Sequence, residues 1–248
     1  MGTISNYFEQ AQLSLAAYAL NLERSAFGSQ NTDYVAALVD AGMSQKQAEI
    51  FANTYRVVDQ STDTLTGFSA TVFADQAGNK YFAIRGTEGI SFAGIQDWLT
   101  NAGIGADGIA VGQGLALFNY LQRLQGAAGS SVVQYYYDPI LGVIGTTSAT
   151  ANGLLSGQTA PISVTGDSLG GHLAMIMSRL VPSLVGSVYT YNAPGFDHLG
   201  TGLTSEGFFI LLRNAPIGPI TGVIGTAWNS GIMSHLFVDG DIVHTVGT

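Results

Sequence analysis

Apolar residues recur at helical spacing along the first quarter of the chain, and short polar residues mark where two of these stretches begin. The first 20 residues carry one amphipathic pattern, and two more follow over Thr32–Asp40 and Ser44–Tyr55, separated at Gly42. Residues suited to helix N-caps stand at the starts of the second and third stretches: Asn31 or Thr32, and Ser44. The pattern therefore predicts a helical layer at the N-terminus.

Further along, the pattern becomes one of strands alternating with helices. Gly67–Ala74 and Lys80–Arg85 are rich in Phe, Val, Tyr and Ile and are joined by the turn sequence DQAGN, which predicts a β-hairpin. A helix is predicted over Ile109–Leu124. After it come a short buried strand, a helix and another strand, over Pro161–Val164, Gly171–Leu180 and Val188–Tyr191. This alternation indicates an α/β sandwich around a largely parallel sheet.

In two stretches the apolar residues recur at neither helical nor strand spacing. Tyr135–Gln158 and Asn214–Ser234 are apolar but rich in Gly, Thr and Ser. One interpretation is a hydrophobic rim or lid over an active site that receives acyl chains. The other is a pair of ordinary surface loops with a few packed apolar residues.

The composition narrows the class of protein. With 248 residues, 46% of them hydrophobic and 10% charged, the chain can bury a large core, and we expect one domain over residues 1–248. The net charge is −9 with only 8 Lys and Arg, which disfavours nucleic acid and anionic membranes as partners and favours a neutral substrate. No apolar run reaches the ~18 residues of a membrane span. The absence of Cys fits either the cytoplasm or an exported protein.

The strongest chemical signal lies between a predicted strand and the helix after it. In PISVTGDSLG, which runs from Pro161 to Gly170, glycines 166 and 170 flank Ser168 as in the G-x-S-x-G turn of serine hydrolases. The motif is short enough to occur by chance, but its strand-to-helix setting is the one that this chemistry needs. We therefore predict that Ser168 is a nucleophile and that the backbone N–H of Leu169 is a donor to the oxyanion.

Four motifs together resemble a known family. They are FAIRGTEG from Phe82, DWLTN from Asp97, VTGDSLGGHLA from Val164 and TYNAPG from Thr190. Their order and spacing resemble the class 3 lipases of the α/β-hydrolase superfamily, most closely a bacterial lipase and esterase branch whose elbow is GDSLGGHLA. The resemblance implies a three-layer α/β-hydrolase-type sandwich with a mostly parallel central sheet. It also implies the roles of several residues: Ser168 as nucleophile, Thr87 and Leu169 as oxyanion donors, and Asp97 with Trp98 as a brace beside the oxyanion loop.

The other two members of a catalytic triad are harder to assign. In the resembled family the acid follows a late strand in an Asp-x-Val context, which Asp241 matches after the strand predicted at His235–Val238. Asp239 and Asp197 are the alternatives. His172 is expected to be a packed residue, because the helix carries it away from the serine hydroxyl. His244 is the one histidine after Asp241, and only three positions separate them, so we expect a chain that lacks its C-terminal histidine loop and last helix. The alternative is a complete triad of Ser168, Asp197 and His244.

The sequence thus predicts a serine ester hydrolase, a lipase or carboxylesterase acting on acylglycerols or other apolar esters. An acyltransferase or thioesterase on the same scaffold and a non-catalytic, hydrolase-like binding module are the alternatives. We expect no organic cofactor, no resident metal and no integral membrane span, and the sequence neither requires nor excludes calcium. The first 20 residues lack the pattern of a signal peptide. Some relatives in the resembled branch leave the cell by a dedicated exporter, so the resemblance implies export without a cleaved leader, with a cytoplasmic location as the alternative. The sequence does not indicate an oligomeric state.

Overall fold

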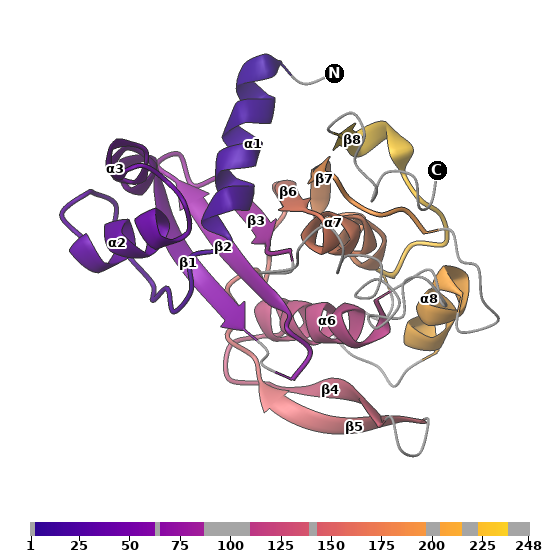
Figure 1. The fold of residues 1–248 in the computed structure, drawn as a ribbon. Coiled ribbons are helices and arrows are strands. Elements are labelled where there is room, and N and C mark those ends of the chain that lie inside the picture. Colours follow the sequence, from indigo (N-terminus) through magenta and orange to yellow (C-terminus); the bar gives the residue numbers. More distant parts are fainter. Residues whose placement is uncertain are drawn as a thin grey trace.

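The centre of the molecule is a six-stranded sheet (Figure 1). The computed structural model describes residues 3–62, 65–86, 110–138, 143–196, 204–214 and 223–237. The strand order is β1-β2-β3-β6-β7-β8, with bounds β1 Tyr55–Thr62, β2 Ser69–Asp75, β3 Lys80–Ile84, β6 Ile162–Asp167, β7 Val185–Tyr191 and β8 Met233–Leu236. The β1–β2 and β2–β3 pairs are antiparallel, whereas the β3–β6, β6–β7 and β7–β8 pairs are parallel. The carboxyl ends of β3, β6, β7 and β8 therefore meet at one edge of the sheet.

The N-terminal helices cover one face of this sheet. They are α1 (Ile4–Ala16), α2 (Thr32–Asp40) and α3 (Gln45–Thr54). Asn31 caps α2 through its side chain, and Ser44 forms a capping box with Gln47 at the start of α3, so both predicted helix starts are confirmed. Their apolar faces share a core with side chains of the first three strands, among them Val57, Phe73 and Ala83.

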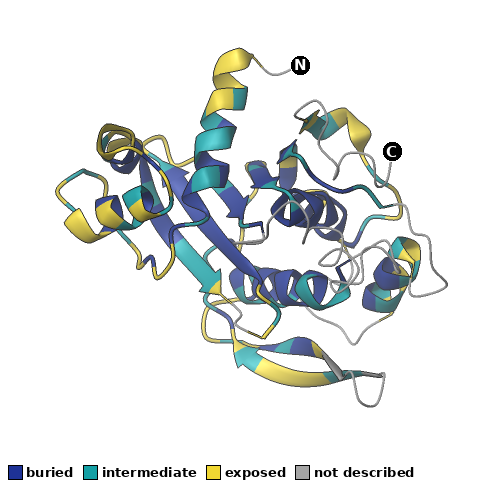
Figure 2. Ribbon diagram, viewed as in Figure 1, coloured by how far each residue is buried: buried dark blue, intermediate teal, exposed yellow. Residues whose placement is uncertain are grey.

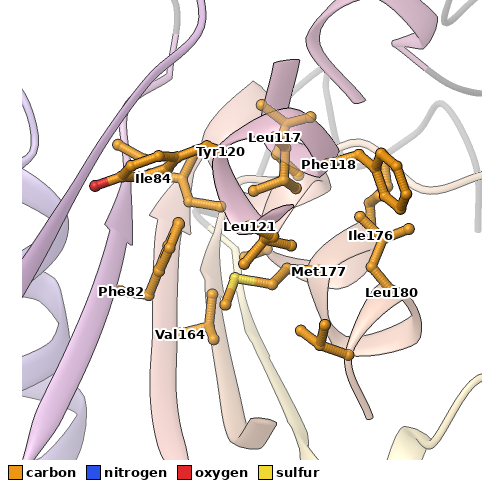
Figure 3. Packing of buried hydrophobic residues seen from close by; sticks show 14 of the residues in the cluster. Phe82, Ile84, Leu117, Phe118, Tyr120, Leu121, Val164, Ile176, Met177 and Leu180 are labelled. Carbon is orange, nitrogen blue, oxygen red and sulfur yellow. The ribbon is translucent and has the colours of Figure 1, made fainter. Parts of the chain in front are cut away.

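The other face is covered by α6 (Val111–Gln125) and α7 (Leu169–Leu180), and α8 (Ser205–Arg213) joins the core on that side through Phe208, Phe209 and Leu212. Strand alternation divides the residues between the two faces: Ala83 packs with the N-terminal helices, while Phe82 and Ile84 join the core under α6 and α7. Figure 3 shows Val164 below Met177, with Phe82 to the left of Leu121 and Met177. Every residue of α7 is buried, as the dark ribbon in Figure 2 shows.

This architecture is the three-layer sandwich of α/β-hydrolase type that the sequence predicts. The β2–β3 hairpin and all five helices of the sequence pattern are present, with ends that shift by a few residues. Strand β6 is longer than expected and runs on to Asp167. Strand β1 and helix α8 were not predicted.

The described part of Tyr135–Gln158 does not form a lid, and residues 139–142 of this stretch lie outside the described residues. Much of this stretch belongs to an antiparallel hairpin of β4 (Ser131–Asp138) and β5 (Val143–Thr150), which packs along α6 (Figure 1). The Asn119 side chain of α6 bonds both backbone groups of Tyr135, at 2.7 Å each. The chain after β5 lies at the opposite edge from Ser168, because the Lys80 ammonium at the start of β3 bonds the carbonyl of Leu154 at 3.1 Å.

The described part of Asn214–Ser234 packs against helices. The Arg179 side chain, near the end of α7, donates to the backbone carbonyls of Gly225 and Thr226, each at 3.1 Å. The Trp228 ring packs on Phe209 of α8, with ring centroids 5.3 Å apart. The described residues of this stretch therefore pack along α7 and α8. Residues 215–222 of the proposed lid lie outside the described residues. Within the described ranges, no helix has the length and hydropathy needed to cross a membrane.

Candidate active site

The turn between β6 and α7 holds Ser168 in a backbone conformation that serine rarely adopts. Its φ is 49° and its ψ is −127°, outside the regions that non-glycine residues populate freely. The other non-glycine residues with positive φ in the described chain are Asn21 and Asn192, and asparagine tolerates this region better than serine does. Ser168 is thus the position where the fold imposes the most unusual backbone on its residue.

Backbone hydrogen bonds fix the turn on both sides. The Ser168 N–H donates to the carbonyl of Tyr191, at the end of β7, with a 2.7 Å separation. The Ser168 carbonyl accepts from the N–H groups of Gly171 and His172, at 3.0 and 3.2 Å. The N–H of Ser168 is therefore held by β7, and its carbonyl is held by the first turn of α7.

The flanking glycines are required because backbone packs directly on backbone. A Cβ on Gly166 would lie 2.4 Å from the carbonyl carbon of Gly170, and a Cβ on Gly170 would lie 2.2 Å from the carbonyl oxygen of Ile84 in β3. Real side chains do not approach backbone atoms this closely. The G-x-S-x-G spacing in the sequence is thus explained by the contact between β3, β6 and α7.

The start of α7 is suited to bind negative charge. Leu169 is the first residue of the helix, and its side chain is buried. The N–H groups of a first helical turn have no carbonyl partner within the helix, and the helix dipole places partial positive charge there. Ser168 itself is only half-buried. A substrate carbonyl that reaches its hydroxyl would come close to these N–H groups.

The end of β3 lies against this turn. Ile84 pairs with Gly166 in the parallel register, and a Cβ on Gly86 would lie 2.7 Å from the backbone oxygen of Asp167. The Asp167 side chain points to the N-terminal layer, where its Oδ1 accepts from the Tyr18 hydroxyl at 2.8 Å. Burial raises the pKa of Asp167, and the hydrogen bond from Tyr18 acts in the opposite direction.

His172 is a packed residue, as expected. It is fully buried in the first turns of α7, its Nδ1 lies 3.2 Å from the carbonyl oxygen of Pro194, and its ring packs on Phe196 with a centroid separation of 4.5 Å. Its Nε2 has no hydrogen-bond partner among the described residues. Burial lowers its pKa to about 4, so the ring is neutral at physiological pH.

A second described histidine, His235, was noticed in the sequence only as the start of a strand. It lies on β8, and its Nδ1 is 2.8 Å from the hydroxyl of Thr190 on β7. Burial lowers its pKa. Within the described ranges, no hydrogen bond joins either His172 or His235 to Ser168. No sequence signal marks the Thr190–His235 pair, since only the parallel register brings these two residues together.

The remaining predicted site residues lie outside the described residues. They are Thr87, Asp97, Trp98, Asp197, Asp239, Asp241 and His244. Their roles stay predictions. Among the residues that the structure does describe, no group of three or more acidic or histidine side chains could hold a metal ion.

The structure is similar to three solved fungal lipases. The Lip2 lipase of Yarrowia lipolytica has 16% sequence identity and a TM-score of 0.38, with 77% of this chain and 59% of that chain covered. A lipase of Rhizopus microsporus var. chinensis has 16% identity and a TM-score of 0.37, with 78% of this chain and 59% of that chain covered. The Rhizomucor miehei lipase in its propeptide complex has 13% identity and a TM-score of 0.37, with 78% of this chain and 54% of that chain covered. This chain thus spans less than two thirds of the length of each. No family model matches the sequence, and no curated protein does.

Proposed function

We propose that this chain is a serine hydrolase that cleaves carboxylic esters through an acyl-enzyme at Ser168. The observation that carries the proposal is the backbone of Ser168, at φ 49° and ψ −127°, directly between a parallel strand and a buried helix. Strain of this kind costs about 1–3 kcal/mol and persists where the surrounding structure enforces it, which happens most often at functional sites. In this turn the strain lifts the hydroxyl out of the strand towards a substrate.

The chemistry follows from the position of the hydroxyl at the helix start. The Ser168 Oγ attacks the ester carbonyl carbon, and the negative charge that forms on the carbonyl oxygen is stabilised by the Leu169 N–H and by Thr87. The group that accepted the serine proton passes it to the alcohol, which leaves as the tetrahedral intermediate collapses to an acyl-enzyme. Water then attacks the acyl carbon and releases the acid, with one proton returned to Ser168.

A general base must accept the serine proton, and its assignment is part of the proposal. The candidates are His244 as base and Asp241, Asp239 or Asp197 as acid. Because only three positions separate Asp241 from His244, Asp197 is the acid for a complete triad within this chain. The burial of His172 and the bond of His235 to Thr190 argue against these two residues as the base. Replacing His244 with Ala should reduce ester hydrolysis at least 1,000-fold, by roughly the loss expected for a triad member. Unchanged hydrolysis in that variant would exclude His244.

The substrate class is an uncharged ester with apolar acyl chains, such as an acylglycerol, as in the class 3 lipases that the sequence resembles. A net charge of −9 and only 8 cationic side chains support a neutral substrate over a phosphate-bearing one. The resemblance in four separate motifs supports this family over other serine hydrolases.

Hydrolysis of p-nitrophenyl butyrate and octanoate by the full chain tests the proposal. Replacing Ser168 with Ala should lower kcat at least 1,000-fold, by about the amount seen when a triad nucleophile is removed. Ser178→Ala is the matched control on the same helix, because the Ser178 hydroxyl bonds the Met175 carbonyl of that helix, at 2.6 Å. That variant should keep its activity. Equal activity of Ser168→Ala and wild type would refute the proposal. A wild type that neither hydrolyses the esters nor reacts with a fluorophosphonate would favour the binding-module alternative.

A further inference from the structure

One hydroxyl group from the N-terminal layer bridges the two strand ends that border the candidate active site. Tyr18 follows the last turn of α1, and its hydroxyl donates to Asp167 Oδ1 at the end of β6, at 2.8 Å. The same oxygen lies against Gly86, at the end of β3, because a Cβ on Gly86 would lie 2.7 Å from it. A tyrosine hydroxyl has one proton to donate, and Asp167 receives it while the oxygen packs against Gly86.

The space around this bridge allows little adjustment. A Cβ on Gly86 would lie 2.7 Å from the Tyr18 hydroxyl and 2.7 Å from the Asp167 backbone oxygen. Gly86 is thus confined between the tyrosine and the end of β6. The Tyr18 hydroxyl and the Asp167 backbone therefore fix where the Gly86 backbone can lie.

The bridge matters for chemistry because each strand end leads directly into a proposed oxyanion donor. Leu169 comes two residues after Asp167, and Thr87 comes directly after Gly86. These are the two oxyanion donors of the proposed function, on which the inference rests. Donors stabilise a transition state only when they are held at the position where the charge develops, and displacement by about 1 Å can cost about 100-fold in rate.

Helix α1 is anchored to the sheet at other points as well. The Gln10 carbonyl accepts from the Thr165 hydroxyl of β6 at 3.1 Å, and the Tyr7 carbonyl accepts from the Tyr191 hydroxyl of β7 at 2.6 Å. Leu13 and Ala16 are fully buried beneath the helix. Removing the Tyr18 hydroxyl would therefore loosen the two strand ends while α1 stays in place.

We propose that Tyr18 is a positioning residue: its hydroxyl holds the end of β3 against the end of β6 and so sets the separation of the two oxyanion donors. It touches neither substrate nor nucleophile in this role. A purely structural tyrosine would contribute to stability alone, whereas a positioning tyrosine changes kcat in protein that is fully folded.

Tyr18→Phe tests the inference, with Tyr120→Phe as the matched control. The Tyr120 hydroxyl also donates to a carboxylate, Asp59 Oδ2 at 3.0 Å, but Asp59 lies on β1, three strands from β6 in the sheet. In p-nitrophenyl butyrate hydrolysis by the full chain, Tyr18→Phe should lower kcat about 10- to 100-fold, because an oxyanion interaction is weakened, and leave KM within about twofold. Tyr120→Phe should lower the Tm and leave kcat unchanged.

Variants of Asp167 give a second route if Tyr18→Phe does not fold. Asp167→Asn keeps an oxygen that can accept from Tyr18, so it should retain more activity than Asp167→Ala. The double variant Tyr18→Phe with Asp167→Ala should be as active as the less active of the two single variants, because both changes break the same hydrogen bond. A folded Tyr18→Phe with wild-type kcat, or Asn and Ala variants of equal kcat, would overturn the inference alone. A wild type without hydrolysis would overturn the proposed function and this inference with it.

Discussion

At their carboxyl ends, strands β3 and β6 pack backbone against backbone, whereas at their amino ends flexible side chains fill the space between elements. Between Ile84 and Gly170 there is no room for a single methyl group. At the other edge, the Lys80 ammonium reaches the Leu154 carbonyl and, at 2.8 Å, the Gln158 side-chain oxygen. Backbone contacts define positions that side-chain rotamers cannot adjust. The contact between Ile84 and Gly170 is thus rigid, whereas the contact of Lys80 at the opposite edge can absorb change.

The sharpest test of the backbone contact at the site is to add one methyl group at each of two matched helix positions, one facing backbone and the other facing a side chain. Gly170 and Gly112 are both the second residue of their helices, α7 and α6. Gly170→Ala should cost about 4 kcal/mol or prevent folding, because its Cβ meets backbone. Gly112→Ala should raise stability by about 0.5–1 kcal/mol, because its Cβ meets the Thr66 methyl at an ordinary contact distance of 3.7 Å and alanine favours helix. Urea denaturation measures both, and equal effects would contradict the contrast.

His172 should make the site end sensitive to acid. Its pKa is lowered from 6.5 to about 4 in the folded protein, so between these pH values the unfolded chain binds a proton that the folded protein does not. Stability should therefore fall by about 3 kcal/mol as the pH drops through this window. His172→Phe, which keeps a ring against Phe196, should lose that slope in denaturation curves measured from pH 7 to pH 4. An identical slope in the variant would show that other groups cause it.

The strain at Ser168 should be measurable apart from its chemistry. Ser168→Gly and Ser168→Ala both remove the hydroxyl, but only glycine adopts the φ of 49° at no steric cost. Ser168→Gly should be more stable than Ser168→Ala by about 1–2 kcal/mol. Calorimetric melting of the two variants gives the difference directly. Equal stability would mean that the turn is relaxed and that the structural argument for a nucleophile fails.

The smallest effect is expected at the amino edge. Lys80→Met removes the bonds to Leu154 and Gln158 and should cost about 1 kcal/mol or less, because the ammonium is partly solvated. Its kcat for ester hydrolysis should match that of the wild type. A marked loss of kcat in folded Lys80→Met would show that the two edges are coupled.

Local sequence signals predicted much of the fold and the centre of the site. Within the motif around Ser168, Gly166 and Gly170 contact each other inside one turn. The caps at Asn31 and Ser44 are likewise decided within a few residues. Such features are accessible to sequence reasoning because every interacting partner is close along the chain.

The features that were missed depend on tertiary contacts or carry a weak pattern. Strand β1 follows α3 with no Gly or Pro at the boundary, and its second half, from Asp59, is polar. In β5, the residues from Thr146 on are small, mostly polar and largely exposed, so the alternation of apolar and polar residues that marks a strand is weak there. The contact between Tyr18 and Asp167 spans 149 positions, and no local pattern relates the two residues.

The central claim is that the fold presents Ser168 as an activated nucleophile. Treating the full chain with a fluorophosphonate probe and locating the adduct by peptide mass spectrometry tests it most directly, because the probe reacts with activated serine hydroxyls and forms a stable bond. We predict a single adduct on the peptide that contains Ser168 and none in Ser168→Ala. A wild type that stays unmodified, or that carries its adduct on another serine, would contradict the account.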